Sequence, residues 1–132
     1  MVEIEFSRKD KNKVSVIQST DGKPYYNIRA IWDKVIRPYA IENIVTGISV
    51  KVPEGYELEL REKSADFVIQ GNRAICHLDT DEIIVPIKNN YAFSKRINGG
   101  DIIAEVVLHK IEKIEWKEKD SETPKKIVKV EK

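Results

Sequence analysis

Apolar and polar residues alternate with a period of two through the middle of the chain. Ile48, Val50 and Val52 share one face of residues 48–52, and the same alternation recurs in residues 56–60. This period indicates strands with one buried face, and the abundance of Val and Ile favours strand over helix. Residues 53–55, Pro-Glu-Gly, have turn chemistry, so residues 48–60 are predicted to form a β-hairpin.

The alternation continues in residues 82–88, and an apolar run occupies residues 101–116 after a polar loop. Proline lacks the N–H that a strand ladder needs. Pro86 therefore predicts an edge strand or a bulge at that point.

Residues 25–40 can be interpreted in two ways. Their apolar positions fall on one helical face that Pro38 would end, but they also fit an irregular strand. Periodicity leaves both alternatives open. The apolar positions are Ile28, Ile31, Trp32, Val35 and Ile36.

The pattern as a whole predicts an all-β chain with short hairpins, folded as a barrel or a clip of strands. At 132 residues the chain has the size of one domain, which we place at residues 1–116. Residues 117–132 form a charged tail with little to bury, expected to be mobile or ordered by a partner. Within it, residues 127–130 are a possible short strand that pairs with a neighbouring chain.

Composition narrows the possible functions. The 23 basic and 22 acidic residues nearly cancel, so general attraction to nucleic acid or anionic lipid is not expected. Cys76 is the one cysteine, which excludes an intramolecular disulfide, and no Cys/His spacing suits a structural zinc. No signal peptide or membrane span is apparent, so a soluble, cytoplasmic protein is expected. The richness in Lys, Glu, Ile and Val suggests a thermophilic source.

Two places carry candidate chemistry. Residues 98–101, Asn-Gly-Gly-Asp, are a tight turn that presents a carboxylate and backbone amides at the entrance of a strand. Asp79 and Asp81 are two residues apart and would share a strand face, where they could bind a cation, although a solvated turn is the commoner arrangement.

Several segments, read in order, resemble the trimeric dUTPase family over about residues 19–116. Residues 22–30, "GKPYYNIRA", align without a gap with the first family motif, G-A-A-G-Y-D-L-x-A, and place Asn27 where the family has a metal-binding aspartate. The segment "TGISVKVPEG", residues 46–55, is the most specific match. The resemblance implies a dUTPase-like β-clip, or distorted jelly-roll barrel, assembled as a homotrimer.

The later motifs depart from the family pattern. Lys63 and Ser64 stand where the second motif has arginine and serine, and Lys cannot make the bidentate phosphate contact of Arg. In the third motif, residues 73–83, Cys76 occupies the position of the water-activating aspartate and Asp79 that of a tyrosine. The fourth motif keeps Gly100 and Asp101, but Glu105 replaces a glutamine that would reach phosphate. The glycine-rich fifth motif is absent.

These departures lead us to expect a non-catalytic, trimeric dUTPase-like scaffold for binding, regulation or, if the source is viral, a structural or decoration role in the virion. The alternative is a divergent pyrophosphatase for dUTP or another nucleoside triphosphate, with Asp79 or Asp81 in place of the missing acid. Nucleotide binding without turnover is a third possibility. No cofactor or metal is expected unless the enzyme alternative holds, when Mg²⁺ would be needed. A protein partner is also possible.

The residues that these patterns place at a candidate site or turn fall into three groups. The ligand-binding candidates are Asn27, Lys63, Ser64 and Glu105. The degenerate catalytic positions are Cys76, Asp79 and Asp81. The residues expected to form a structural turn are Gly99, Gly100 and Asp101.

Overall fold

The computed structural model describes residues 1–14, 17–76 and 81–120. Within these residues the chain forms strands and no helix, so none is present that could span a membrane. The strands are β1 (Glu5–Arg8), β2 (Tyr26–Arg29), β3 (Lys34–Ile36), β4 (Ile41–Lys51), β5 (Tyr56–Arg61), β6 (Val68–Ile69), β7 (Ala74–Cys76), β8 (Glu82–Lys88), β9 (Lys95–Ile97) and β10 (Ile102–Lys110). The all-β prediction is confirmed.

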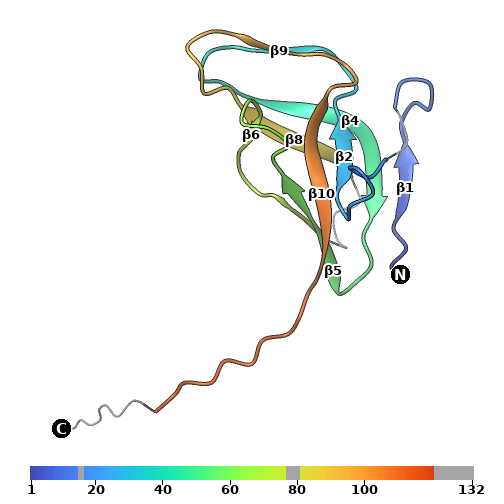
Figure 1. Ribbon diagram of the computed structural model, residues 1–132, viewed down its shortest axis with the longest axis vertical. Helices are drawn as coiled ribbons and strands as arrows, with labels where there is room; N and C mark the ends of the chain where they lie inside the picture. The colour runs from blue at the N-terminus through green and yellow to red at the C-terminus, as the bar shows by residue number, and fades with distance from the viewer. Residues whose placement is uncertain (15–16, 77–80, 121–132) are drawn as a thin grey trace, which may run out of the picture.

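Two four-stranded antiparallel sheets make up the body (Figure 1). The first has the order β1-β4-β8-β6 and the second β2-β10-β5-β7, while β3 and β9 pair separately. Buried Ile and Val side chains from both sheets form one core, including Ile44 and Val85 from the first sheet and Ile28 and Val106 from the second. Each such side chain contributes about 1.5–3 kcal/mol when it leaves water, so the core holds the two sheets together.

The turn at residues 53–55 forms as predicted, but the hairpin does not. Tyr56 N donates to Pro53 O at 3.2 Å, and Gly55 has a φ of 88°. However, β4 pairs with β1 and β8, whereas β5 pairs with β10 and β7. The turn therefore passes the chain from one sheet to the other. Alternation shows which face of a strand is buried but does not identify its partner.

Residues 25–40 form β2 and β3, which settles the open choice in favour of strand. Trp32 and Val35 belong to the helical face considered above, yet they are 48% and 49% exposed. Ile28 and Ile36 are buried. Each of these two short strands therefore buries one apolar side chain, and the segment has no continuous apolar helical face.

Pro86 does not mark an edge strand or a bulge. It lies in β8, which has β4 on one side and β6 on the other, opposite Asn43 of β4. Its carbonyl accepts from Gln70 N at 2.9 Å, just beyond the end of β6. In a strand, the N–H and the C=O of one residue point to the same side. The N–H that Pro86 lacks would therefore face the end of β6, where β8 has few hydrogen bonds to lose.

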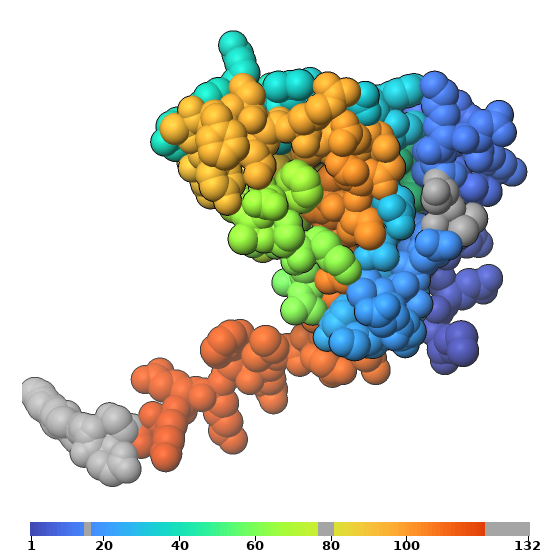
Figure 2. Space-filling view, turned by 45° about the horizontal axis from the view of Figure 1, so that its top comes forward, coloured from blue at the N-terminus to red at the C-terminus, as the bar shows by residue number. Residues whose placement is uncertain are grey.

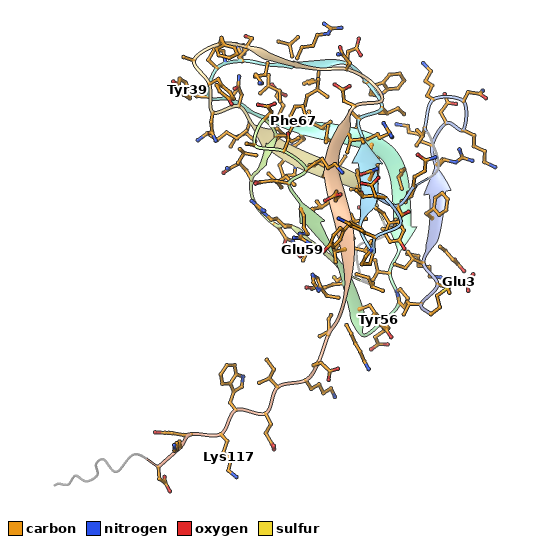
Figure 3. All side chains as sticks on the ribbon, in the orientation of Figure 1. Glu3, Tyr39, Tyr56, Glu59, Phe67 and Lys117 are labelled. Atoms are coloured by element: carbon orange, nitrogen blue, oxygen red, sulfur yellow. The ribbon has the colours of Figure 1, made fainter. Side chains whose placement is uncertain are left out.

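Beyond β10 the chain leaves the body as an extended arm, residues 111–120 (Figures 1 and 2). Ile111, Ile114 and Trp116 are exposed along it, Trp116 by 87%. Side chains of the arm as far as Lys117 stand clear of the two sheets (Figure 3). The possible strand at residues 127–130 lies outside the described residues.

Candidate functional site

Three polar residues form a row across the outer face of the second sheet. Glu105 of β10 is in register with Asn27 of β2 on one side and with Arg61 of β5 on the other. Their chain neighbours Ile28, Leu60 and Val106 are buried. Because successive side chains point to opposite faces of a sheet, burial of these neighbours directs the row outward.

Two further side chains turn part of this row into a compact polar cluster, consisting of Thr20, Asn27, Lys63 and Glu105. Thr20 Oγ1 lies 2.7 Å from Glu105 Oε2 and 2.9 Å from Asn27 Oδ1. Lys63 Nζ lies 3.0 Å from the same Glu105 oxygen and 3.4 Å from Asn27 Oδ1. The structure therefore brings together three of the four ligand-binding candidates.

The cluster favours the ionised form of Glu105. The hydrogen bond from Thr20 lowers the pKa of this carboxyl, and the hydrogen bond and charge of Lys63 and the charge of Arg61 lower it further, against a smaller rise from burial. Its side chain is only 15% exposed. Glu105 is therefore a fixed negative charge at neutral pH.

Positive charge nevertheless exceeds negative charge at this site. Arg61 lies over the ring of Tyr25, with its guanidinium carbon 5.0 Å from the ring centroid. Lys63 keeps 31% of its side chain exposed beside Glu105. Two cations thus surround one carboxylate on an outward-facing surface, an arrangement that suits an anionic ligand such as a phosphate.

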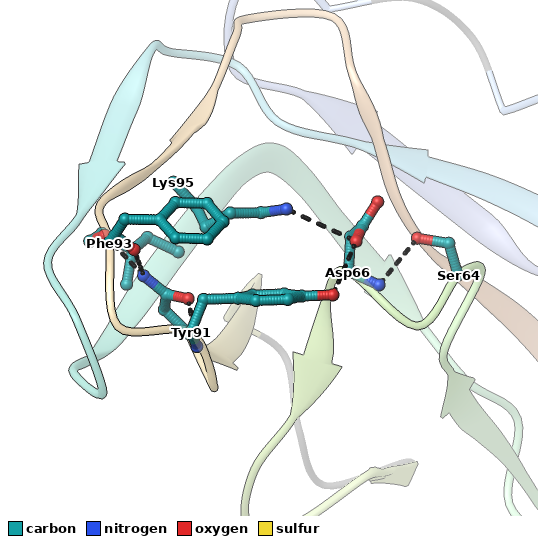
Figure 4. Close-up of polar contacts among 7 residues, drawn as sticks. Ser64, Asp66, Tyr91, Phe93 and Lys95 are labelled. Atoms are coloured by element: carbon teal, nitrogen blue, oxygen red, sulfur yellow. Dashed lines mark hydrogen bonds and ion pairs between the residues drawn. The ribbon is translucent and has the colours of Figure 1, made fainter.

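Ser64 is adjacent to the polar cluster but contacts a different group. Its Oγ accepts from Asp66 N at 3.3 Å (Figure 4). Lys95 Nζ and Tyr91 Oη each lie 3.4 Å from Asp66 Oδ1, and the Lys95 ammonium lies 4.5 Å from the centroid of the Tyr91 ring. These contacts fasten the loop that carries Lys63 and Ser64 to residues 89–95.

The corner at residues 98–101 uses its polar groups in hydrogen bonds with its own backbone and with Asp33. Asp101 Oδ2 accepts from Asn98 N at 2.8 Å, and Gly99 N donates to Asp33 Oδ1 at 2.7 Å. Gly100 has a φ of 95°, and a Cβ at Gly99 would lie 2.9 Å from Ile31 O. Carboxylate and amides both serve the turn, so this corner is no ready-made phosphate cradle.

Of the third-motif candidates, Cys76 lies far from the polar cluster within one chain. Cys76 is half-buried on β7 and in register with Glu57, four residues from Arg61 along β5. At strand spacings of about 4.8 Å and rises of about 3.3 Å per residue, Cys76 lies ~14 Å across the sheet and ~13 Å along it from Asn27. Asp81 is exposed just before β8 of the other sheet. Asp79 lies outside the described residues.

Two residues of the site were not singled out from the sequence, Thr20 and Arg61. Thr20 contacts Glu105 across 85 positions of the chain, and no local pattern marks it. Arg61 follows an alternating strand and has the appearance of an ordinary exposed end residue. Only the pairing of β10 with both β2 and β5 places Arg61 beside Glu105.

The fold is that of solved dUTPase structures. The Staphylococcus bacteriophage 80alpha dUTPase in a form with dUpNHpp superposes with a TM-score of 0.78 at 21% identity, covering 96% of each chain. The dUTPase of S. aureus phage phi11 superposes with a TM-score of 0.77 at 20% identity, covering 91% of this chain and 98% of the phage protein. These likenesses confirm the dUTPase-like fold.

Sequence relatives define the family. A deoxyuridine 5'-triphosphate nucleotidohydrolase of Finegoldia magna is 34% identical over 108 residues, 76% of each chain. A protein of the same name from Anaplasma marginale is 32% identical over 98 residues, 67% of this chain and 65% of its own. No family model matches the chain. The chain belongs to the dUTPase family.

The prediction of a non-catalytic scaffold is wrong. The relatives that share about a third of their residues with this chain are named for dUTP hydrolysis, which supports the enzyme alternative. Considered one at a time, the changed motif residues each suggest a lost contact to the substrate. The structure instead places Asn27, Lys63 and Glu105 in one hydrogen-bonded cluster with a cation facing outward.

Proposed function

We propose that this protein hydrolyses dUTP, or another nucleoside triphosphate, to the monophosphate and pyrophosphate. Water attacks the α-phosphorus, the bond from that phosphorus to the oxygen bridging the α- and β-phosphates breaks, and pyrophosphate leaves. The observation that carries the proposal is the 34% identity to a deoxyuridine 5'-triphosphate nucleotidohydrolase over 76% of both chains.

The phosphates bind, in this proposal, at the polar cluster and the loop beside it. Lys63 supplies a point charge to phosphate oxygens, and Arg61 adds a second positive charge nearby. Ser64 supplies a hydroxyl donor. Since Lys cannot make the two-pronged contact of Arg, the position of its ammonium relative to Glu105 and Asn27 matters for this site.

A second copy of the chain completes the site. Because Cys76 lies far across the sheet from Asn27 of its own chain, we propose a homotrimer in which the third motif of one copy faces the polar cluster of another. Ile41 and Ile84 are exposed on the outer face of the first sheet, and Ile111, Ile114 and Trp116 are exposed on the arm. Contiguous exposed apolar surface is typical of protein interfaces. Packing between copies would cover these side chains.

Asp81, with Asp79 as its alternative, is our proposed base for the attacking water. A positioned carboxylate contributes about 10²–10⁴-fold to such a step. Cys76, at the family's acid position, has no carboxylate to offer.

Mg²⁺ fits the proposed reaction through the substrate. Among the described residues, no group of three or more His, Cys, Asp or Glu side chains is placed to hold a metal ion. Mg²⁺ in nucleotide enzymes takes one or two protein oxygens and completes its shell with phosphates and water, so the phosphates of the substrate would supply much of its shell. The bound ion would neutralise phosphate charge.

The test is to incubate the purified protein with each deoxynucleoside triphosphate and Mg²⁺ and measure pyrophosphate. We expect release from dUTP, reduced about 100-fold or more in D81N or in D79N. E3Q removes an exposed carboxylate near the N-terminus (Figure 3) and serves as the matched control. Lack of pyrophosphate from every nucleotide would overturn the proposal.

Mixing two inactive variants tests the shared site. K63A and D81N damage opposite halves, so hybrid trimers formed by unfolding and refolding the two together would contain some intact sites. Recovered activity in the mixture supports a site built between copies. Light scattering that gives a monomer at micromolar concentration, with full activity, would contradict it.

A further inference from the structure

We propose that Glu105 is a positioning residue that holds Lys63 for phosphate, and that the carboxylate and the amide of the Asn27–Glu105 pair can exchange strands without loss of that function. This inference rests on the proposed function. The question is how Lys63 can bind phosphate well, because an ammonium without neighbouring contacts would not be held in one position.

The surroundings of Lys63 fix the place of its ammonium. This group has two oxygen neighbours in the cluster, Glu105 Oε2 at 3.0 Å and Asn27 Oδ1 at 3.4 Å. Lys has a flexible four-carbon stem and three N–H donors that rotate freely. Contacts from two strands restrict the ammonium to one place, and its remaining donor capacity is available to an incoming anion.

Glu105 is itself held stiffly. Thr20 Oγ1 lies 2.7 Å from the carboxylate oxygen that also meets Lys63, and the Glu105 side chain is largely buried. A carboxylate held by a hydroxyl and by its strand is a rigid counter-charge. It can orient Lys63, whereas a mobile surface glutamate would not.

Asn27 and Glu105 occupy equivalent places around Lys63. They are register partners on adjacent strands, and both approach Thr20 and Lys63. The site therefore contains one carboxylate and one amide facing one ammonium. Moving the acid from one strand to its register partner preserves the charge next to Lys63.

The experiment is a double-mutant cycle on dUTP hydrolysis and on affinity for the non-hydrolysable analogue dUpNHpp. E105Q removes the counter-charge, and N27D adds a second carboxylate that repels phosphate. We expect each single variant to lose about 10-fold in affinity and in kcat/KM, and N27D/E105Q to recover to within about 3-fold of wild type. Such coupling lies within the ~2- to 150-fold range of contacting residues. E59Q, on the same sheet outside the polar cluster, controls for loss of a negative charge.

Two readouts separate positioning from a structural role. In N27D the two adjacent carboxylates raise the apparent pKa of the pair, so its KM should improve as pH falls, and this pH dependence should vanish in N27D/E105Q. E105D keeps the charge and should recover part of the affinity lost in E105Q. Thermal denaturation of each variant checks that it folds. If E105Q is unstable, the activities of E105D and of N27D/E105Q still test the inference.

The outcomes distinguish this inference from the proposed function. If wild type hydrolyses dUTP and E105Q matches it in KM and analogue affinity, the inference fails and the function stands. If the protein binds dUpNHpp but hydrolyses no nucleotide, the proposed function fails. The dUpNHpp affinities of wild type, E105Q, N27D and N27D/E105Q then decide whether the inference holds. If wild type neither binds nor hydrolyses, both are overturned.

Discussion

Gly47, in the middle of β4, is a position where a single added methyl group should be costly. It has a φ of 72°, and a Cβ at this position would lie 2.7 Å from Val14 Cγ2 and 2.9 Å from Ile31 Cδ1. Both distances are well below ordinary van der Waals contact. The left-handed backbone costs a non-glycine residue about 1–2 kcal/mol, and overpacking a core costs about 1–3 kcal/mol more.

We therefore expect G47A to lower the free energy of unfolding by about 2–5 kcal/mol. G55A is the matched control because Gly55 has a φ of 88° but no atom within 4 Å of the place that a Cβ would take; it should lose only the backbone part, about 1–2 kcal/mol. Urea unfolding followed by far-UV circular dichroism, at one protein concentration for all variants, measures both losses. Equal losses in the two variants would refute the clash with Val14 and Ile31.

Three further predictions concern the buried amide, the polar cluster and the proposed base. Asn89 is buried, and its Nδ2 lies 3.0, 3.3 and 2.8 Å from the carbonyls of Ile36, Arg37 and Phe93; N89L should lower the unfolding free energy by about 2–4 kcal/mol in urea unfolding, and a loss under about 1 kcal/mol would contradict the satisfied network. Glu105 has a lowered pKa, so its ionised form stabilises the fold above its usual pKa and this contribution is lost as pH falls through the folded value. The gap in melting temperature between wild type and E105Q should therefore be full well above pH 4.5 and narrow as the pH falls below it. A constant gap would argue against the ion pair. D81N should lower kcat with little effect on dUpNHpp affinity, whereas a parallel loss of affinity would place Asp81 among the binding groups.

The fold class could be predicted because burial on one face leaves a period of two in the sequence. The strands at residues 48–52, 56–60 and 82–88 were recognised in this way. Their partners could not be, because pairing depends on long-range contacts that alternation does not encode. The two strands around the turn at residues 53–55 consequently separate into different sheets.

In residues 25–40 the strands are too short for the sequence pattern to distinguish strand from helix. A strand of three or four residues contains too few positions to distinguish a period of two from a period of 3.6. Exposure of Trp32 and Val35 separates the alternatives, and it depends on how β3 pairs with β9 beside the main sheets. No property of the segment alone contains that information.

The candidate site was identified residue by residue but not as an assembly. Asn27, Lys63 and Glu105 each depart from a motif of the family that the sequence resembles, and each alone suggests a lost contact. Their mutual hydrogen bonds appear only when β2 lies beside β10, and Thr20 enters from a stretch without any motif. That Asn27 and Glu105 are cross-strand partners is visible only in the register of the sheet.

Steady-state hydrolysis by wild type and K63A decides whether the chain hydrolyses dUTP with Lys63 at the phosphates. Loss of a hydrogen bond to a charged phosphate costs about 1.5–3 kcal/mol, so kcat/KM for K63A should fall ~10- to 150-fold at unchanged melting temperature. Measurable pyrophosphate release by wild type with this loss in K63A is the predicted result. Absence of hydrolysis by wild type, or equal kcat/KM in the two proteins, would contradict the account.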